Sequence, residues 1–214
     1  MRFVSMIRGS AVALGLTLAT TALAAAPVRT TDSGQNASIF AQSPSDIVCA
    51  DGSFGQVFSS FSINARQNVV KSSGGPSTAR VVEVLRSSFN TCDFVFSTAF
   101  GSDDKATYTQ KQASSAKIEG TIAMFDMQNG MPLGNATVSL TLTASANAQK
   151  TRRDERNVFG NVTVVNRSTG SFADATVSGS LIIGGENLLA ATQDRFANLG
   201  DNTTGSVTFT RSTK

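Results

Sequence analysis

The densest group of ionisable side chains is the run 150–156. Its candidate ligand-binding members are Arg152, Arg153, Asp154, Glu155 and Arg156. If the run is a β-strand, even and odd positions lie on opposite faces, so each face would carry arginine beside a carboxylate. One interpretation is recognition of an anionic or polyhydroxyl ligand, because planar guanidinium groups match carboxylate oxygens. The other, which the sequence favours, is a solvated edge strand whose charges discourage edge-to-edge pairing.

Histidine is absent from the chain, and its absence excludes several reaction classes. Ser-His-Asp and Cys-His catalysis need an imidazole, and so do many zinc sites. The chemistry left open is that of a carboxylate pair, a Ser-Lys pair or an oxygen-ligand cation site, and the enzyme alternative is hydrolysis by a pair of carboxylates from different strands. The candidate acids are Glu83, Glu119, Asp126 and Glu186. The chain has no tryptophan and one tyrosine, which weakens this alternative, because sugar clefts usually stack rings on these side chains.

Cys49 and Cys92 are the two cysteines of the chain. In an oxidising compartment an even count of two favours one disulfide bond, and the spacing excludes a Cys-x-x-Cys redox motif. The alternative is a pair of buried free thiols. In both cases the sequence predicts a structural role.

Alternating hydrophobicity predicts the strands that position these groups. Over residues 135–145, Val138, Leu140 and Leu142 alternate with hydroxyl side chains, which is typical of a half-buried strand. The same period recurs over 173–183, with alanine, valine, leucine and isoleucine on one face. The sequence thus predicts two strands with one face in the core.

Phenylalanine is abundant, with 14 residues, and we expect most of these side chains in the core. Cys92, Phe94 and Phe96 form a predicted inward row. The candidates for an exposed aromatic patch are Phe54, Phe58 and Phe61.

Turn residues such as Asn129-Gly130 and Gly184-Gly185 separate the short alternating runs. This pattern predicts an all-β fold, either an antiparallel β-sandwich or a closed β-barrel-like domain. One short helix is predicted near 187–199, where apolar residues approach helical spacing.

The chain is expected to begin with a signal peptide over residues 1–24. Two arginines precede an apolar run of about 14 residues, and Ala22-Leu23-Ala24 fits the small-residue cleavage pattern. The run is short for a bilayer span, so no transmembrane segment is expected after cleavage. Residues 25–45 are small and polar and predict a flexible N-terminal segment. Residues 46–214 are expected to form a single β domain.

These patterns predict an exported protein, either secreted or periplasmic. Without Arg2 and Arg8 of the leader, the chain has 16 basic and 15 acidic residues, so no nucleic-acid partner is expected. We expect a non-enzymatic role, binding or structural, in the cell envelope or extracellular space. A protein or a glycan is the candidate partner, with no metal and no cofactor. The alternative is a secreted hydrolase that uses a pair of carboxylates.

Overall fold

The structure is a computed structural model that describes residues 30–160, 162–189 and 204–213. Eleven strands are assigned within these residues. They are β1 (Thr31–Val48), β2 (Phe54–Ser72), β3 (Gly75–Asn90), β4 (Phe96–Asp103), β5 (Thr107–Lys111), β6 (Ser115–Asp126), β7 (Pro132–Ala144), β8 (Gln149–Phe159), β9 (Val162–Ile183), β10 (Glu186–Asn187) and β11 (Thr204–Thr213).

The hydrogen-bonded strands form a closed ring. From β1 the antiparallel pairs run through β2, β3, β4, β6, β7, β9 and β11 and return to β1. The junction between β4 and β6 is the shortest, with the residue pairs Ala99–Asp126 and Phe100–Phe125. The predicted all-β fold, an antiparallel sandwich or barrel-like domain, is therefore confirmed.

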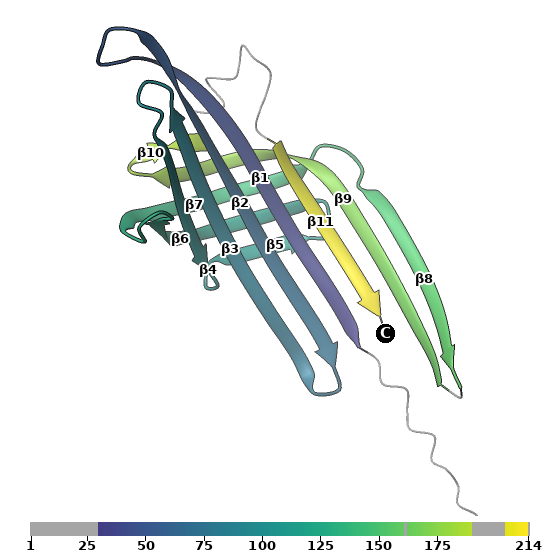
Figure 1. The fold of residues 1–214 in the computed structure, drawn as a ribbon. Helices are drawn as coiled ribbons and strands as arrows, with labels where there is room; N and C mark the ends of the chain where they lie inside the picture. Colours follow the sequence, from purple (N-terminus) through teal and green to yellow (C-terminus); the bar gives the residue numbers. More distant parts are fainter. Residues whose placement is uncertain (1–29, 161, 190–203, 214) are drawn as a thin grey trace, which may run out of the picture.

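The strands lie in two layers that share β9. In Figure 1 the long strands β3, β2, β1, β11, β9 and β8 form a front layer, and the shorter strands cross behind its upper half. The first half of β9 pairs with β8 and β11, whereas its second half pairs with β7 of the rear layer. Below the rear strands the front sheet continues alone (Figure 1).

The core lies between the layers and follows the predicted alternation. Val138, Leu140 and Leu142 of β7 are buried, as the period-two pattern predicted. The predicted row along β9 also faces the core, through Ala173, Ala175, Leu181 and Ile183. The front layer contributes short inward rows from β1, β2, β3 and β11.

The prediction of a flexible segment over 25–45 is wrong from Thr31 onward. These residues belong to β1, which pairs with both β2 and β11. Ala37, Ile39 and Ala41 face the core and are buried. Two of these three side chains are only alanine, so the apolar face of β1 contrasts weakly with its small polar neighbours and the period is hard to detect.

The prediction that most phenylalanines are in the core is also wrong. Phe61 is the one buried phenylalanine among the described residues. The predicted inward row of Cys92, Phe94 and Phe96 does not form, because the turn between β3 and β4 breaks the alternation. Phe94 adopts a φ of 56° in this turn and is 77% exposed.

Two other predictions fall largely outside the described residues. The signal peptide over 1–24 lies wholly outside them. Of the helix predicted near 187–199, only the helical Leu188 and Leu189 are described beyond β10. Within the described ranges, no helix is both long enough and apolar enough to cross a membrane.

Cys49 and Cys92 form a disulfide bond, as predicted. The bond joins the turn after β1 to the turn after β3, two segments that are far apart in the sequence.

Tyr108 of β5 provides a test of the core through its ionisation. Its side chain is 1% exposed, and its hydroxyl donates a hydrogen bond to Oε1 of Gln110. Burial raises the pKa of Tyr108 well above its usual value, because the charged phenolate would lose its hydration. The folded pKa thus exceeds the unfolded one, so this contribution to stability is complete below pH about 10 and declines above it.

We therefore expect the effect of Tyr108→Phe to change with pH. At pH 7 the variant should be less stable by about 1 kcal/mol, through the lost hydrogen bond. Above pH about 10, wild-type stability should fall relative to the variant by up to about 1.4 kcal/mol per pH unit, so the order reverses. Denaturant unfolding from pH 7 to 11 measures this difference. A constant difference over that range would contradict the assignment.

Candidate ligand-binding site

The front sheet extends beyond the rear layer and exposes both of its faces. The rear layer meets it at β5, where Nε2 of Gln110 donates to the carbonyl oxygen of Thr208 at 2.8 Å. Beyond this contact β3, β2, β1, β11, β9 and β8 continue side by side. We call this part the extension. Its inner face continues the core-facing side of the strands, and its outer face is the opposite side.

β8 is an edge strand, because among the described residues it pairs only with β9. Its register places Arg152 and Asp154 on the inner face, joined by Nη2–Oδ2 and Nε–Oδ2 contacts of 2.7 and 3.1 Å. Arg153 and Glu155 form the corresponding pair on the outer face, with Nη2 and Oε1 2.5 Å apart. The geometry has the predicted alternation, and a ligand-binding role of the run 150–156 stays a prediction.

The register of the sheet brings further bases to the inner face. Asp154 lies opposite Arg167 on β9, and Arg152 lies in one row with Thr169 and then Arg211 of β11. The basic members of this face are Lys71, Arg80, Lys150, Arg152, Arg156, Arg167 and Arg211. Asp154 is the acid among them. We call this set the basic face.

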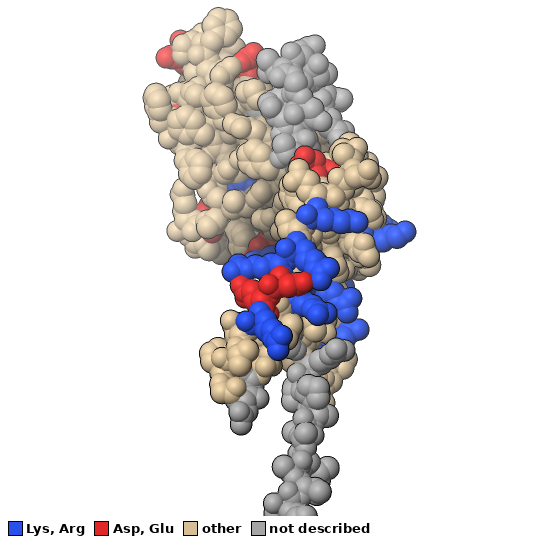
Figure 2. Space-filling view, turned by 90° about the vertical axis from the view of Figure 1, so that its right-hand side faces the viewer, with Lys and Arg blue, Asp and Glu red and all other residues tan. Residues whose placement is uncertain are grey.

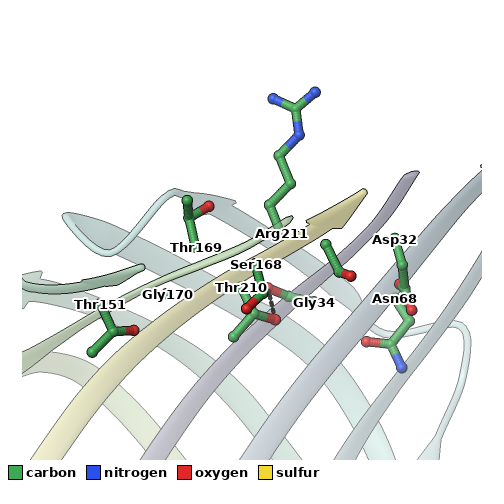
Figure 3. Close-up of a pocket in the computed structure, with 10 residues that line it drawn as sticks. Asp32, Gly34, Asn68, Thr151, Ser168, Thr169, Gly170, Thr210 and Arg211 are labelled. Carbon is green, nitrogen blue, oxygen red and sulfur yellow. Dashed lines mark hydrogen bonds between the residues drawn. The ribbon is translucent and has the colours of Figure 1, made fainter. Parts of the chain in front are cut away.

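Figures 2 and 3 locate parts of this arrangement. Figure 2 shows Lys and Arg gathered around a small acidic group on the side of the molecule that carries β8. In Figure 3, Arg211 and Thr169 point away from one side of the sheet, whereas Thr151 and Thr210 point away from the other. In this view the basic Arg211 and the hydroxyl residues Thr151 and Thr210 thus lie on opposite faces.

Most guanidinium groups of the basic face are not neutralised by carboxylates. In the described part of the chain, Arg156, Arg167 and Arg211 form no ion pair. Nε of Arg80 is buried without a hydrogen-bond partner. The hydrogen bond and charge of Arg152, with a smaller effect of Arg167, lower the pKa of Asp154. Asp154 is therefore ionised at neutral pH and compensates only one of the surrounding charges.

Hydroxyl groups lie between the bases on the same face. They belong to Thr31, Ser33, Thr78, Thr169 and Thr213. Hydroxyl groups both donate and accept hydrogen bonds, so the face can bind neutral polar groups as well as anionic ones.

Sequence reasoning found Arg152 and Arg156 but missed the bases on other strands. Arg167 and Arg211 are single charges in separate segments, and only the register of β9 with β8 and β11 brings them together. A signal was present, because Arg211 continues the period-two row of Val207 and Phe209. The row would normally place Arg211 in the core, and only the end of the rear layer before this position leaves its side chain on an open face.

Shallow hollows lie along β1 on the outer face. The first, of about 260 Å³, lies where Gly34 and Gly170 lack side chains, between Asn68 and Thr151 (Figure 3). Two others, of about 180 and 330 Å³, follow toward Phe40. Hydroxyl and carboxamide groups dominate their linings, and each of the three contains at most one carboxylate. The outer face is therefore polar but has no local excess of positive charge.

The candidate carboxylates of the hydrolase alternative are not brought together. Their closest recorded partners are Arg66 for Glu83, Lys117 for Glu119 and the backbone amide of Gln128 for Asp126. Glu186 is exposed on β10. Within the described residues there is no group of three or more Cys, Asp or Glu placed to hold a metal ion.

Comparison with known proteins gives no family. No family model matches the chain, and no curated protein matches it. Two solved structures align over most of its length. One is an acetoacetate decarboxylase-like enzyme from Sphingomonas wittichii RW1, with 9% sequence identity and a TM-score of 0.25. The alignment covers 87% of this chain and 90% of the enzyme's chain. The other is the enduracididine biosynthesis enzyme MppR, with 10% sequence identity and a TM-score of 0.23. The alignment covers 96% of this chain and 95% of the MppR chain. Values this low carry no conclusion about fold or function.

Proposed function

We propose that this chain is an exported, non-enzymatic binding protein whose basic face recognises an acidic polysaccharide. The observation that carries the proposal is the set of seven bases against one acid on the inner face of the extension. Export is inferred from the predicted signal peptide, and the disulfide bond is compatible with an oxidising compartment. The corresponding location is the periplasm or the extracellular space.

The spacing of the bases suits an extended ligand that crosses the strands. Arg211 on β11 and Arg152 on β8 are two strands apart, a separation of about 10 Å, and Thr169 on β9 lies between them. A polymer lying along this row would meet base, hydroxyl and base in turn. Guanidinium groups bind carboxylate or sulfate oxygens through paired donors, and the hydroxyls suit the neutral oxygens of a sugar.

The mixture of groups favours an acidic glycan over a nucleic acid. Nucleic-acid surfaces usually rely on a clear excess of Lys and Arg over the whole domain. Here the charge is nearly balanced over the chain outside the predicted leader, and the excess is confined to one face. The basic face also mixes its charges with threonine and serine hydroxyls, which match a polyhydroxyl polymer.

The test uses polygalacturonate as the acidic probe and dextran as the neutral one. Arg152→Ser/Arg211→Ser is expected to weaken polygalacturonate binding by at least tenfold, because each lost charged hydrogen bond is worth about 1.5–3 kcal/mol. The matched control is Arg66→Ser/Arg153→Ser on the outer face, which removes the same charge from the same sheet and should change affinity less than about twofold, since it leaves every inner-face contact intact. Titration calorimetry measures both affinities.

The other outcomes are equally informative. An equal loss in both double variants would mean that binding follows net charge and not the basic face. Dextran binding as tight as polygalacturonate binding would remove the role of the arginines. Tighter binding of duplex DNA than of polygalacturonate would replace the glycan with a nucleic acid. Binding to polygalacturonate should also weaken as salt rises, because the contacts are exposed to screening.

A further inference from the structure

A second surface collects exposed hydrophobic side chains around the turns that follow β1, β3 and β6. We call these turns and their flanking residues the aromatic end. Its exposed large hydrophobic side chains are Val48, Phe54, Phe94, Val95, Phe96, Phe100, Phe125, Met127, Met131 and Leu133. They are ten of the seventeen such side chains among the described residues. Concentration of apolar surface in one place is typical of an interaction site.

The aromatic end is one contiguous surface. The Cys49–Cys92 disulfide joins its first two turns, and Nε2 of Gln128 in the third turn donates to the carbonyl oxygen of Phe96 at 2.9 Å. The cross-strand aromatic pairs are Phe58–Phe89, Phe89–Phe96 and Phe100–Phe125. Phe58 and Phe89 of these pairs are half-buried, whereas Phe96, Phe100 and Phe125 are exposed.

Carboxylates predominate among the charges at this end, where Arg86 of β3, opposite Ala99, is the neighbouring base. Asp46, Asp51, Asp93 and Asp126 lie in or beside the three turns. The segments 42–65, 87–104 and 118–149, which build this end, contain no Lys or Arg. A partner that combines apolar contact with positive charge therefore fits best. An anionic lipid surface would be repelled.

The chain itself has a surface of that kind in β8. Val158 and Phe159 are 62% and 67% exposed at the end of this edge strand, Val158 on its inner face and Phe159 on its outer face. The same strand carries Lys150, Arg152, Arg153 and Arg156 against Asp154 and Glu155. We call Lys150–Phe159 the basic strand end. Figure 1 shows that the end of β8 and the turn after β1 lie at opposite ends of the molecule.

We infer that the aromatic end of one copy docks on the basic strand end of a second copy. The two surfaces are different and lie far apart on one chain, so each bound copy leaves one free surface of each kind. A contact of this type adds copies head to tail and continues unless the geometry closes a ring. The inference goes beyond glycan binding because it assigns a partner, a second copy of the chain, to the aromatic end; the basic strand end shares Lys150, Arg152 and Arg156 with the basic face.

Complementary variants test the head-to-tail arrangement. Phe94→Ser/Phe96→Ser removes two aromatic rings from the aromatic end, and Val158→Ser/Phe159→Ser removes the apolar part of the basic strand end. All four side chains are more than half exposed, so both variants should fold, which circular dichroism and thermal unfolding check. Ile182→Ser, at an exposed position of β9 outside both surfaces, is the matched control.

Light scattering after size-exclusion chromatography and sedimentation velocity give the masses. The wild type and Ile182→Ser should form species of rising mass as concentration increases, and 0.5 M salt should reduce this association, because exposed charges are screened. Each double variant alone should be monomeric. An equimolar mixture of the two should form a heterodimer of twice the monomer mass, because each retains the surface that the other lacks.

Three results would overturn the inference. The first is a wild type that is monomeric at every concentration. The second is dimerisation of Val158→Ser/Phe159→Ser alone, which would mean that two aromatic ends meet symmetrically. The third is binding of the aromatic end to vesicles of neutral phosphatidylcholine without any self-association. Because the basic strand end shares bases with the basic face, these masses are measured without polygalacturonate, so failure of self-association is distinguishable from failure of glycan binding.

Discussion

Replacing Cys49 and Cys92 together by serine is expected to lower the free energy of unfolding by about 4 kcal/mol. The two residues are 43 apart in sequence, so their bond restricts the unfolded chain by closing a long loop. For a domain of this size, about 4 kcal/mol corresponds to a decrease in Tm of about 8–16 °C. Thermal and denaturant unfolding of the double variant measure the change.

The folded state offers little compensation for the lost bond. A Cβ at Gly55 would lie 2.5 Å from Sγ of Cys92 and 2.8 Å from Sγ of Cys49, so the backbone of β2 packs directly against the bridge. Serine is close to cysteine in size, so the replacement should open only a small void there. The wild type under reducing conditions is the control and should show a similar loss. An unchanged Tm in both would contradict the stabilising role.

The parts of the fold that could be predicted are those where side-chain contrast is strong. Val138, Leu140 and Leu142 alternate with hydroxyl residues, and β7 has the buried face that this pattern predicts. Asn129-Gly130 and Gly184-Gly185 occupy turns, with φ positive at Gly130, Gly184 and Gly185. These features are local, because the hydrophobic period and the turn residues specify them without knowledge of the partner strands.

The prediction failed where the assignment depends on non-local structure. β1 pairs with β2 from near the start of the chain and with β11 from its end, so its central position is not visible in its own weak alternation. The phenylalanines of β3 and β4 were assigned to the core by residue type alone. They lie outside because the inward positions of these strands are already filled, among others by Val82 and Val84.

In the candidate site, too, local features could be predicted from the sequence, whereas features that depend on strand pairing could not. The alternation of Arg152 and Asp154 with Arg153 and Glu155 was predicted from sequence, and the structure places the two pairs on opposite faces. Their environment was not predictable, because Arg167 enters through the register of β9. Period-two reasoning gives the face of each residue, whereas the register decides which charges of different strands share it.

Gly179→Ala is expected to destabilise the fold about as strongly as loss of the disulfide, by about 3–5 kcal/mol, because it combines two sources of strain. Gly179 lies opposite Leu140 where β9 pairs with β7, and its φ is 114°, a conformation that favours glycine. A Cβ there would lie 2.1 Å from the carbonyl oxygen of Ser139. Since the obstructing atom belongs to the backbone, rotation of a side chain cannot relieve the contact, and the two strands must separate.

Gly130→Ala separates the two effects. Gly130 also has a positive φ, of 73°, but a Cβ at this position would have no neighbour within 4 Å. This control should therefore lose only the conformational part, about 1–2 kcal/mol. Denaturant unfolding of both variants gives the comparison. A larger loss for Gly130→Ala than for Gly179→Ala would mean that close approach of β7 and β9 is not what requires glycine. The expected larger loss for Gly179→Ala would mean that the pairing of β7 with β9 is what requires glycine. This pair joins the second half of β9 to the rear layer and closes the ring.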